Sequence, residues 1–214
     1  MNKTKLRKAL VCFAVFLLWT WMIHRIDLQP IGPRGSMVGL SKINVFFHEL
    51  TGVHYSLYVL TDWLGLVPIV VCIGFGILGF CQWIRRKSIR KVDADILVLG
   101  MYYLVVMAAF VFFEKCIVNY RPVLIDGVLE ASYPSSTTLL VICVMSTAIM
   151  QFRLRIKRHV IKQVLIIPCR IFTLLMVVFR FLSGVHWFTD IIGGILLSLA
   201  LIMLYSACFI SDET

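Results

Sequence analysis

Charged residues are scarce in this sequence of 214 residues, and their scarcity excludes most soluble proteins. They make up 15% of the chain and hydrophobic residues 60%, whereas soluble domains carry about 25% charged and about 45–50% apolar residues. A cytosolic enzyme, a secreted domain and a disordered tail are therefore poor fits. The seven cysteines show neither the CxxC spacing of a metal site nor a disulfide framework. The composition predicts an integral membrane protein.

Six apolar runs are long enough to cross a bilayer. A hydrocarbon core about 30 Å thick requires about 20 apolar residues in each helix. We predict an all-α, six-transmembrane-helix bundle that forms a single membrane domain over residues 1–214. The loop over residues 25–56 is expected to contain an interfacial segment, because residues 40–50 mix apolar and polar positions. The predicted spans cover approximately residues 9–24, 57–84, 95–114, 135–152, 163–182 and 188–209.

Short basic segments account for most of the net charge of +10. Most of the 21 Lys and Arg residues lie before the first span, at residues 85–91 and at residues 153–162. With six spans these segments share one side of the membrane, which the positive-inside rule assigns to the cytoplasm. We expect cytoplasmic termini, extracytoplasmic loops at 25–56, 115–134 and 183–187, and a bacterial plasma membrane. No nucleic-acid partner is expected, because each basic run is short and explained by topology.

Ionisable side chains gather at the outer ends of the spans, and a histidine with an aspartate is the most informative pair. His186 and Asp190 are four residues apart and so share one face of a helix. A carboxylate at that spacing can accept a hydrogen bond from one ring nitrogen and leave the other free to attack. Arg180 lies on the preceding span, and Ser183-Gly184 can turn the chain between them.

Two further clusters complete a predicted phosphate site. Lys115 and Arg121 follow the third span, although cations at helix ends also commonly reach out to lipid head groups. Ser135, Ser136 and Thr137 precede the fourth span, where a helix N-terminus with free N–H groups can bind an anion. The simpler alternative for these three residues is an ordinary helix cap. Cations, N–H groups and a nucleophile at one depth suit phosphoryl transfer.

The order and spacing of these clusters, over about residues 95–200, resemble the type 2 phosphatidic acid phosphatase superfamily, also called lipid phosphate phosphatases. That family has six spans and three motifs, Lys-x6-Arg-Pro, Pro-Ser-Gly-His and Ser-Arg-x5-His-x3-Asp. The resemblance implies a hydrolase without metal or cofactor, in which His186 forms a phosphohistidine and Asp190 is its partner. The implied phosphate-binding residues are Arg121, Arg180, Ser135, Lys115, Ser136 and Thr137.

The sequence departs from these motifs at three positions. Glu114 occupies the place of the first-motif lysine, Phe179 that of the third-motif serine, and Thr137 replaces the histidine that protonates the leaving group. Expelling an alkoxide from a monoester benefits from a general acid by roughly 10²–10⁴-fold, whereas a lipid diphosphate expels a phosphate, a better leaving group. The enzyme is therefore expected to prefer a polyprenyl diphosphate, to use another acid, or to be impaired. The candidate acids are His48, His54, Glu114 and Glu130.

Three other functions stay open. A catalytically reduced relative would bind a lipid phosphate without turnover, and a phosphotransferase would pass the phosphate from His186 to another lipid or a sugar. A transporter has little support, because no pair of broken helices stands out. Metal catalysis is not expected, because His48 and His54 lack the spacing of a zinc protease. Arg170 falls within the fifth span and has no assigned partner.

Overall fold

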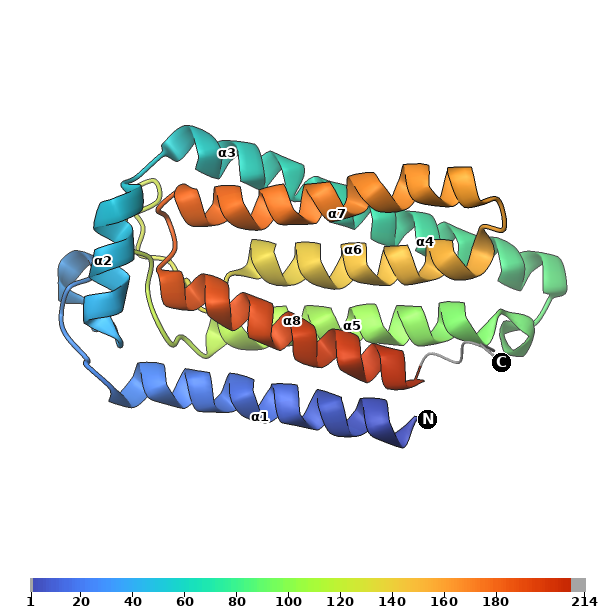
Figure 1. Cartoon of the computed structure of the whole chain (residues 1–214), viewed down its shortest axis with the longest axis horizontal. Helices are drawn as coiled ribbons and strands as arrows, with labels where there is room; N and C mark the ends of the chain where they lie inside the picture. Colours follow the sequence, from blue (N-terminus) through green and yellow to red (C-terminus); the bar gives the residue numbers. More distant parts are fainter. Residues whose placement is uncertain (1, 209–214) are drawn as a thin grey trace.

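The computed structural model describes residues 2–208 and confirms the all-α, six-span architecture (Figure 1). Six segments are long and apolar enough to cross a membrane, and no strand occurs between residues 2 and 208. The predicted last span extends to residue 209, which lies outside the described residues. The spans are α1 (Lys3–Arg25), α3 with α4 (Tyr55–Leu64 and Leu66–Arg86), α5 (Ala94–Lys115), α6 (Ser136–Arg155), α7 (His159–Leu182) and α8 (Phe188–Cys208), with short 3-10 turns η1 (Pro33–Gly35) and η2 (Ile89–Lys91) in the loops.

The second span is broken into two helices at Gly65. The sequence predicts one continuous apolar run over residues 57–84, but Pro68 cannot continue a helix through this point. Its ring lacks an N–H and would clash with the carbonyl of Leu64 in an unbroken helix. Gly65 itself keeps a right-handed helical backbone, and its N–H donates to the carbonyl of Thr61 at 3.0 Å, so the interruption is confined to this residue. The break is therefore encoded locally by a glycine and a proline.

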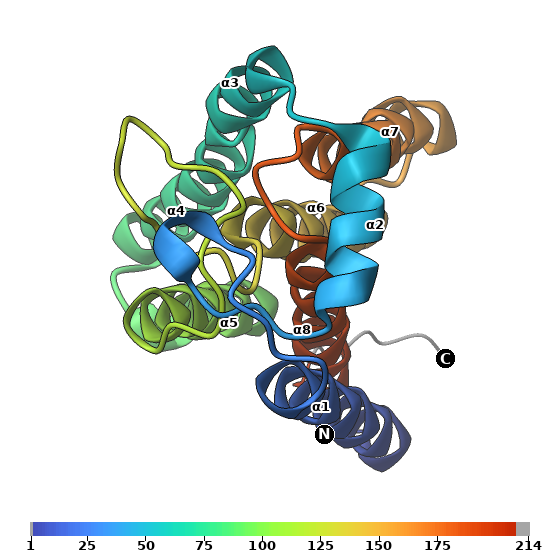
Figure 2. The same ribbon diagram turned by 90° about the vertical axis from the view of Figure 1, so that its left-hand side faces the viewer.

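An additional helix, α2 (Ser41–Thr51), crosses one end of the bundle (Figures 1 and 2). It is attached to the start of α8 by Asn44, which is fully buried. The Asn44 amide donates to the Thr189 hydroxyl (3.0 Å) and its oxygen accepts the Thr189 N–H (3.1 Å). Phe47 also stacks on Phe188 with 4.1 Å between ring centroids. This helix confirms the predicted segment between the first two spans.

The centre of the bundle is formed by α6 and α8. In the most apolar 18-residue segment of each of these two helices, 50% of the residues are buried, compared with 6% in the α3–α4 span. Helix α1 packs along α8, where the Trp19 indole donates to the Thr189 carbonyl at 3.2 Å. Helix α1 begins at Lys3, earlier than the predicted residue 9, because the Asn2 side chain caps it by accepting the Lys5 N–H. The outward faces of the other spans are apolar, as a lipid environment requires.

At the end opposite α2, ion pairs tie three helices together. Arg155 of α6 pairs with Asp93 (3.1 Å) and with Asp95 at the start of α5. Arg86, the last residue of α4, pairs with Asp93 at 2.7 Å. The arginines hold the pKa of Asp93 below its ordinary value, chiefly through the hydrogen bond from Arg86. All three basic segments lie at this end of the bundle.

Candidate active site

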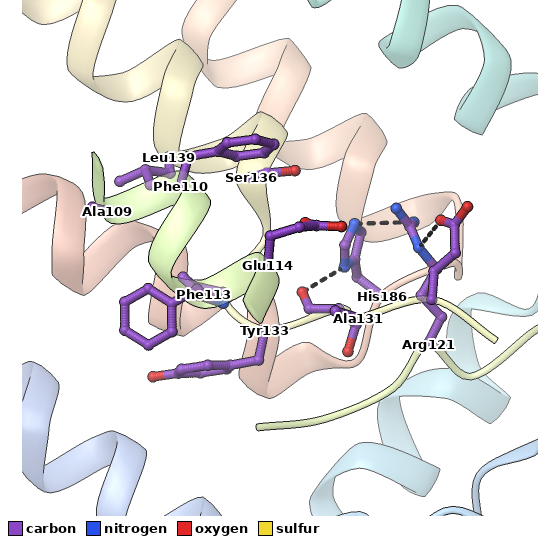
Figure 3. A pocket seen from close by; sticks show the side chains of 13 residues that line it. Ala109, Phe110, Phe113, Glu114, Arg121, Ala131, Tyr133, Ser136, Leu139 and His186 are labelled. Atoms are coloured by element: carbon purple, nitrogen blue, oxygen red, sulfur yellow. Dashed lines mark hydrogen bonds and ion pairs between the residues drawn. The ribbon is translucent and has the colours of Figure 1, made fainter. Parts of the chain in front are cut away.

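A cavity of about 50 Å³ lies near the end of the bundle that α2 crosses (Figure 3). Its walls come from the last turns of α5, the loop that follows α5, the first turn of α6 and the turn before α8. The side chains that line this small cavity are therefore far apart in the sequence. Its polar and charged lining residues are Glu114, Arg121, Glu130, Ser132, Ser136 and His186.

The turn between α7 and α8 brings His186 into this cavity. Gly184 has a φ of +67°, and a Cβ at this position would lie 1.9 Å from the carbonyl oxygen of Gly52. Only glycine fits both the left-handed backbone and this close approach. The carbonyl of Ser183 accepts the His54 N–H at 2.9 Å. The chain therefore turns at Ser183-Gly184, as the sequence predicts, and the turn rests on the connection between α2 and α3.

His186 is buried and held in one tautomer. Its Nε2 lies 3.3 Å from Nη1 of Arg121, and its Nδ1 lies 3.1 Å from the carbonyl oxygen of Ser132. Because a guanidinium group only donates, Nε2 must accept and Nδ1 must carry the proton. Burial, followed by the charges of Arg121 and Arg180, lowers the pKa of His186 well below its ordinary value. The ring is therefore neutral, with the Nε2 lone pair facing the cavity.

Asp190 lies close to His186 but does not accept its N–H. The Asp190 Oδ2 is 3.8 Å from Nδ1, beyond hydrogen-bond distance, and the ring proton goes to Ser132. This corrects the predicted histidine–aspartate hydrogen bond. Asp190 instead caps α8 by accepting the Trp187 N–H (2.9 Å), as the third residue of a helix can do, and it accepts a bond from Asn119 (3.3 Å). Its carboxylate remains near enough to stabilise positive charge on the ring.

Two arginines converge beside His186, as the sequence predicts. The guanidinium groups of Arg121 and Arg180 lie over the ring of Tyr58, at 5.8 and 5.0 Å from its centroid. Arg121 pairs through Nε with Glu130 (3.0 Å), and Arg180 donates from Nη1 to Thr61 (3.1 Å). Arg180 is only 2% exposed, and its Nε has no hydrogen-bond partner among residues 2–208. Two buried cations with unused donors could bind an anion here.

Lys115, which is predicted to bind phosphate, does not reach the cavity. Lys115 is exposed and does not line it, whereas the preceding residue, Glu114, does. Successive residues on a helix point about 100° apart, so only one of the two can face His186. The placement of Lys115 among the phosphate-binding residues is therefore not supported by the geometry. A carboxylate occupies that position.

The three hydroxyl residues at the start of α6 face different directions. Ser136 lines the cavity. Ser135 is buried, donates its N–H to the Asp190 carbonyl (3.0 Å) and accepts a hydrogen bond from Thr138 (3.0 Å), so its side chain is engaged within the protein. Thr137 lines a separate, larger cavity. Of the three, only Ser136 is placed to meet a ligand beside His186.

The larger cavity has a volume of about 550 Å³ and is lined mainly by apolar side chains of α4, α5 and α6. It adjoins the smaller one, because Phe110, Ser136 and Leu139 line both. Further polar residues in its lining are Asp62, Tyr103 and Thr137. A polar cavity therefore lies next to a larger apolar one.

The remaining candidate residues lie elsewhere. The ring of His48 packs on Trp187, with centroids 5.4 Å apart, and burial lowers the pKa of His48. His54 contacts the carbonyl of Thr51 at 2.9 Å, and neither histidine lines the cavity. Arg170 is exposed on the outer face of α7. Within residues 2–208, no group of three or more His, Cys, Asp or Glu side chains is arranged to hold a metal ion.

Comparisons with known proteins agree with this architecture. No model of a protein family matches the sequence, and no curated protein does. Among solved structures, the chain is similar to a transmembrane PAP2 type phosphatidylglycerolphosphate phosphatase from Bacillus subtilis. The two share 19% sequence identity and a TM-score of 0.57, over 93% of this chain and 94% of the other. The chain therefore has the fold of the type 2 phosphatidic acid phosphatase (PAP2) superfamily.

Proposed function

We propose that this protein is a membrane lipid phosphatase that works without a metal ion and forms a phosphohistidine at His186. The observation that carries this proposal is the buried, neutral imidazole whose Nε2 faces a cavity beside Arg121 and Arg180. A nucleophile next to two partly unpaired guanidinium groups suits attack on a phosphorus atom. The PAP2 fold, shared with a known phosphatase, supports the same reaction class.

The site geometry gives each residue a role in the first step. A bound phosphate would draw the Arg121 guanidinium away from Nε2 and free the lone pair for in-line attack. Arg121 and Arg180 would then stabilise the equatorial phosphate oxygens. As the phosphorus–nitrogen bond forms, the ring becomes positive, and Asp190 at 3.8 Å stabilises that charge. The Ser132 carbonyl keeps the proton on Nδ1 throughout.

The adjoining apolar cavity supports a lipid substrate. Its walls of α4, α5 and α6 can accept a hydrocarbon chain while the phosphate lies beside His186. Thr137 faces this apolar cavity, so it cannot take the place of the second-motif histidine next to the nucleophile. We therefore propose that a polyprenyl diphosphate is hydrolysed in preference to a lipid monophosphate, because its leaving group needs less protonation. The positive-inside rule supports a site on the extracytoplasmic face of a bacterial plasma membrane.

The test is phosphate release by purified protein in detergent, with EDTA present, from phosphatidic acid and from a polyprenyl diphosphate. We expect release from both substrates with the diphosphate favoured, and a loss of at least about 10³-fold in His186→Ala, since removing a nucleophile abolishes covalent catalysis. The matched control is His159→Ala, at the exposed start of α7, which should retain full activity.

Other outcomes separate the competing functions. Tight binding of the lipid without phosphate release would indicate a lipid-phosphate-binding protein. A product that forms only when an acceptor lipid or sugar is added would indicate a phosphotransferase. Release that persists in His186→Ala would contradict the phosphohistidine.

A further inference from the structure

The cavity contains few side chains that could deliver a proton to a leaving group. The titratable groups that line it are Glu114, Arg121, Glu130, Tyr133 and His186. His186 is the proposed nucleophile, and a guanidinium group does not give up its proton in this pH range. The Tyr133 hydroxyl is bonded to Thr20 (2.7 Å), and burial raises the pKa of Tyr133. This leaves the two glutamates.

The two glutamates differ in their surroundings. Glu130 pairs with Nε of Arg121 at 3.0 Å, so its carboxylate already has a fixed, positively charged partner. Glu114 has no hydrogen-bond or ion-pair partner among the residues that the structure describes. Figure 3 shows the Glu114 side chain extending from α5 toward the imidazole of His186. Glu114 is also exposed, so it can exchange protons with water.

A carboxylate in a phosphate site needs an explanation. Two negative groups in one small cavity repel each other unless they share a proton. Glu114 stands where the PAP2 motif has a lysine, which would simply attract the phosphate. The same chain lacks the second-motif histidine, since Thr137 faces the other cavity. Glu114 explains both the absent lysine and the absent histidine if it supplies the proton that the histidine would give to the leaving group.

We propose that Glu114 is the general acid and base of this site, a role that rests on the proposed phosphatase activity. In the first step, Nε2 of His186 attacks phosphorus, the bond from phosphorus to the leaving oxygen breaks, and that oxygen takes the proton of the Glu114 carboxyl. In the second step, the Glu114 carboxylate accepts a proton from water as the water oxygen attacks phosphorus. The phosphorus–nitrogen bond then breaks, its electron pair returns to Nε2, and inorganic phosphate leaves.

The experiment compares two leaving groups on one lipid chain, in wild-type protein and in Glu114→Gln, which keeps the shape but cannot carry the proton. A polyprenyl monophosphate expels an alkoxide, and the matching diphosphate expels a phosphate. We expect Glu114→Gln to lower kcat for the monophosphate by about 10²–10⁴-fold. For the diphosphate, the loss of kcat should be clearly smaller, less than about 10-fold, because its leaving group needs less protonation.

Glu49→Gln is the matched control, because Glu49 is exposed on α2, lies outside the cavity and undergoes the same change. Equal losses on both substrates in Glu114→Gln would overturn the role, since a positioning or binding defect does not depend on the leaving group. A wild-type protein that hydrolyses the diphosphate but not the monophosphate would also overturn it and leave the proposed function standing. No turnover of either substrate by the wild-type protein would instead contradict the proposed function.

Discussion

At the scale of single residues, the protonation of His186 is fixed by its two neighbours. The carbonyl of Ser132 takes the Nδ1 proton, and Arg121 requires a lone pair on Nε2. A protonated ring would also bring a third positive charge next to Arg121 and Arg180. The imidazole is therefore neutral, and the proposed attack from Nε2 would need no separate base to remove a proton.

The depressed pKa of His186 leads to a prediction about pH. Lowering the pH from about 7.5 to about 6 crosses the ordinary pKa of histidine, but it should not protonate this one. We expect the amount of phosphohistidine formed from a polyprenyl diphosphate, whose leaving group needs little protonation, to be the same at both pH values in a rapid-quench experiment. A fall of several-fold at the lower pH would show that His186 titrates normally. The free energy of unfolding, in contrast, should depend on pH. It should decrease below about pH 6.5, because His186 binds a proton more readily in the unfolded chain than in the folded protein.

The sequence predicts part of this site and misses the rest for physical reasons. His186, Arg121 and Arg180 could be found because ionisable groups at the ends of apolar spans are rare and costly. Ser132 could not be found, because it acts through a backbone carbonyl that any residue supplies. Whether Glu114 or Lys115 faces the cavity depends on how α5 is rotated about its axis. The sequence does not give this rotation, because both residues are charged and adjacent.

At the scale of elements, the turn between α7 and α8 depends on one glycine. Gly184 combines a left-handed backbone with contact against the carbonyl of Gly52. Its neighbour Ser183 ends α7 with a hydrogen bond from its hydroxyl to the Arg180 carbonyl at 2.7 Å. A shift of this turn would move Arg180 and His186 relative to each other, because they lie on either side of it.

We predict that Gly184→Ala destabilises the protein and abolishes phosphate release. The added Cβ would lie 1.9 Å from the Gly52 oxygen, and a strained backbone alone costs about 1–3 kcal/mol. Thermal unfolding in detergent should show a clearly lower midpoint. Gly76→Ala in α4 is the control, because a Cβ there meets nothing within 4 Å, and it should be neutral or stabilising by up to about 1 kcal/mol. Equal behaviour of the two variants would contradict the importance of this turn.

The helices were more predictable than their ends. Apolar runs of bilayer length identify six spans, because a spanning helix must satisfy its backbone internally. Their limits depend on local details that hydropathy does not register, such as the Asn2 cap and the break at Gly65. The mixed pattern over residues 40–50 predicts α2, but its attachment through Asn44 to Thr189 is a tertiary contact without a local sequence signal.

At the scale of the whole molecule, polarity is divided between the two ends of the bundle. One end carries the basic segments and the Arg155–Asp93–Asp95 pairs, and the other carries α2 and the cavity. A lipid phosphate presents its head group at the membrane surface and its chain below it. The small polar cavity and the adjoining apolar one have the same order.

This division predicts which cysteine is accessible from outside the cell. Cys116 follows α5 at the cavity end and is exposed. A membrane-impermeant maleimide added to intact cells should label the wild-type protein, and Cys116→Ser should lose that label. Labelling of Cys116 only after the membrane is permeabilised would place the cavity on the cytoplasmic side and reverse the proposed orientation.

The contact between Gly52 and Gly184 also bears on how the protein is made. Helices enter the membrane in the order of synthesis, so the α2–α3 connection is in place long before the turn that rests on it. Nascent chains that have inserted only the early spans carry Arg121 and Ser132 but lack His186. The proposed site is therefore among the last parts of the protein to assemble, and a partly inserted chain lacks the proposed nucleophile.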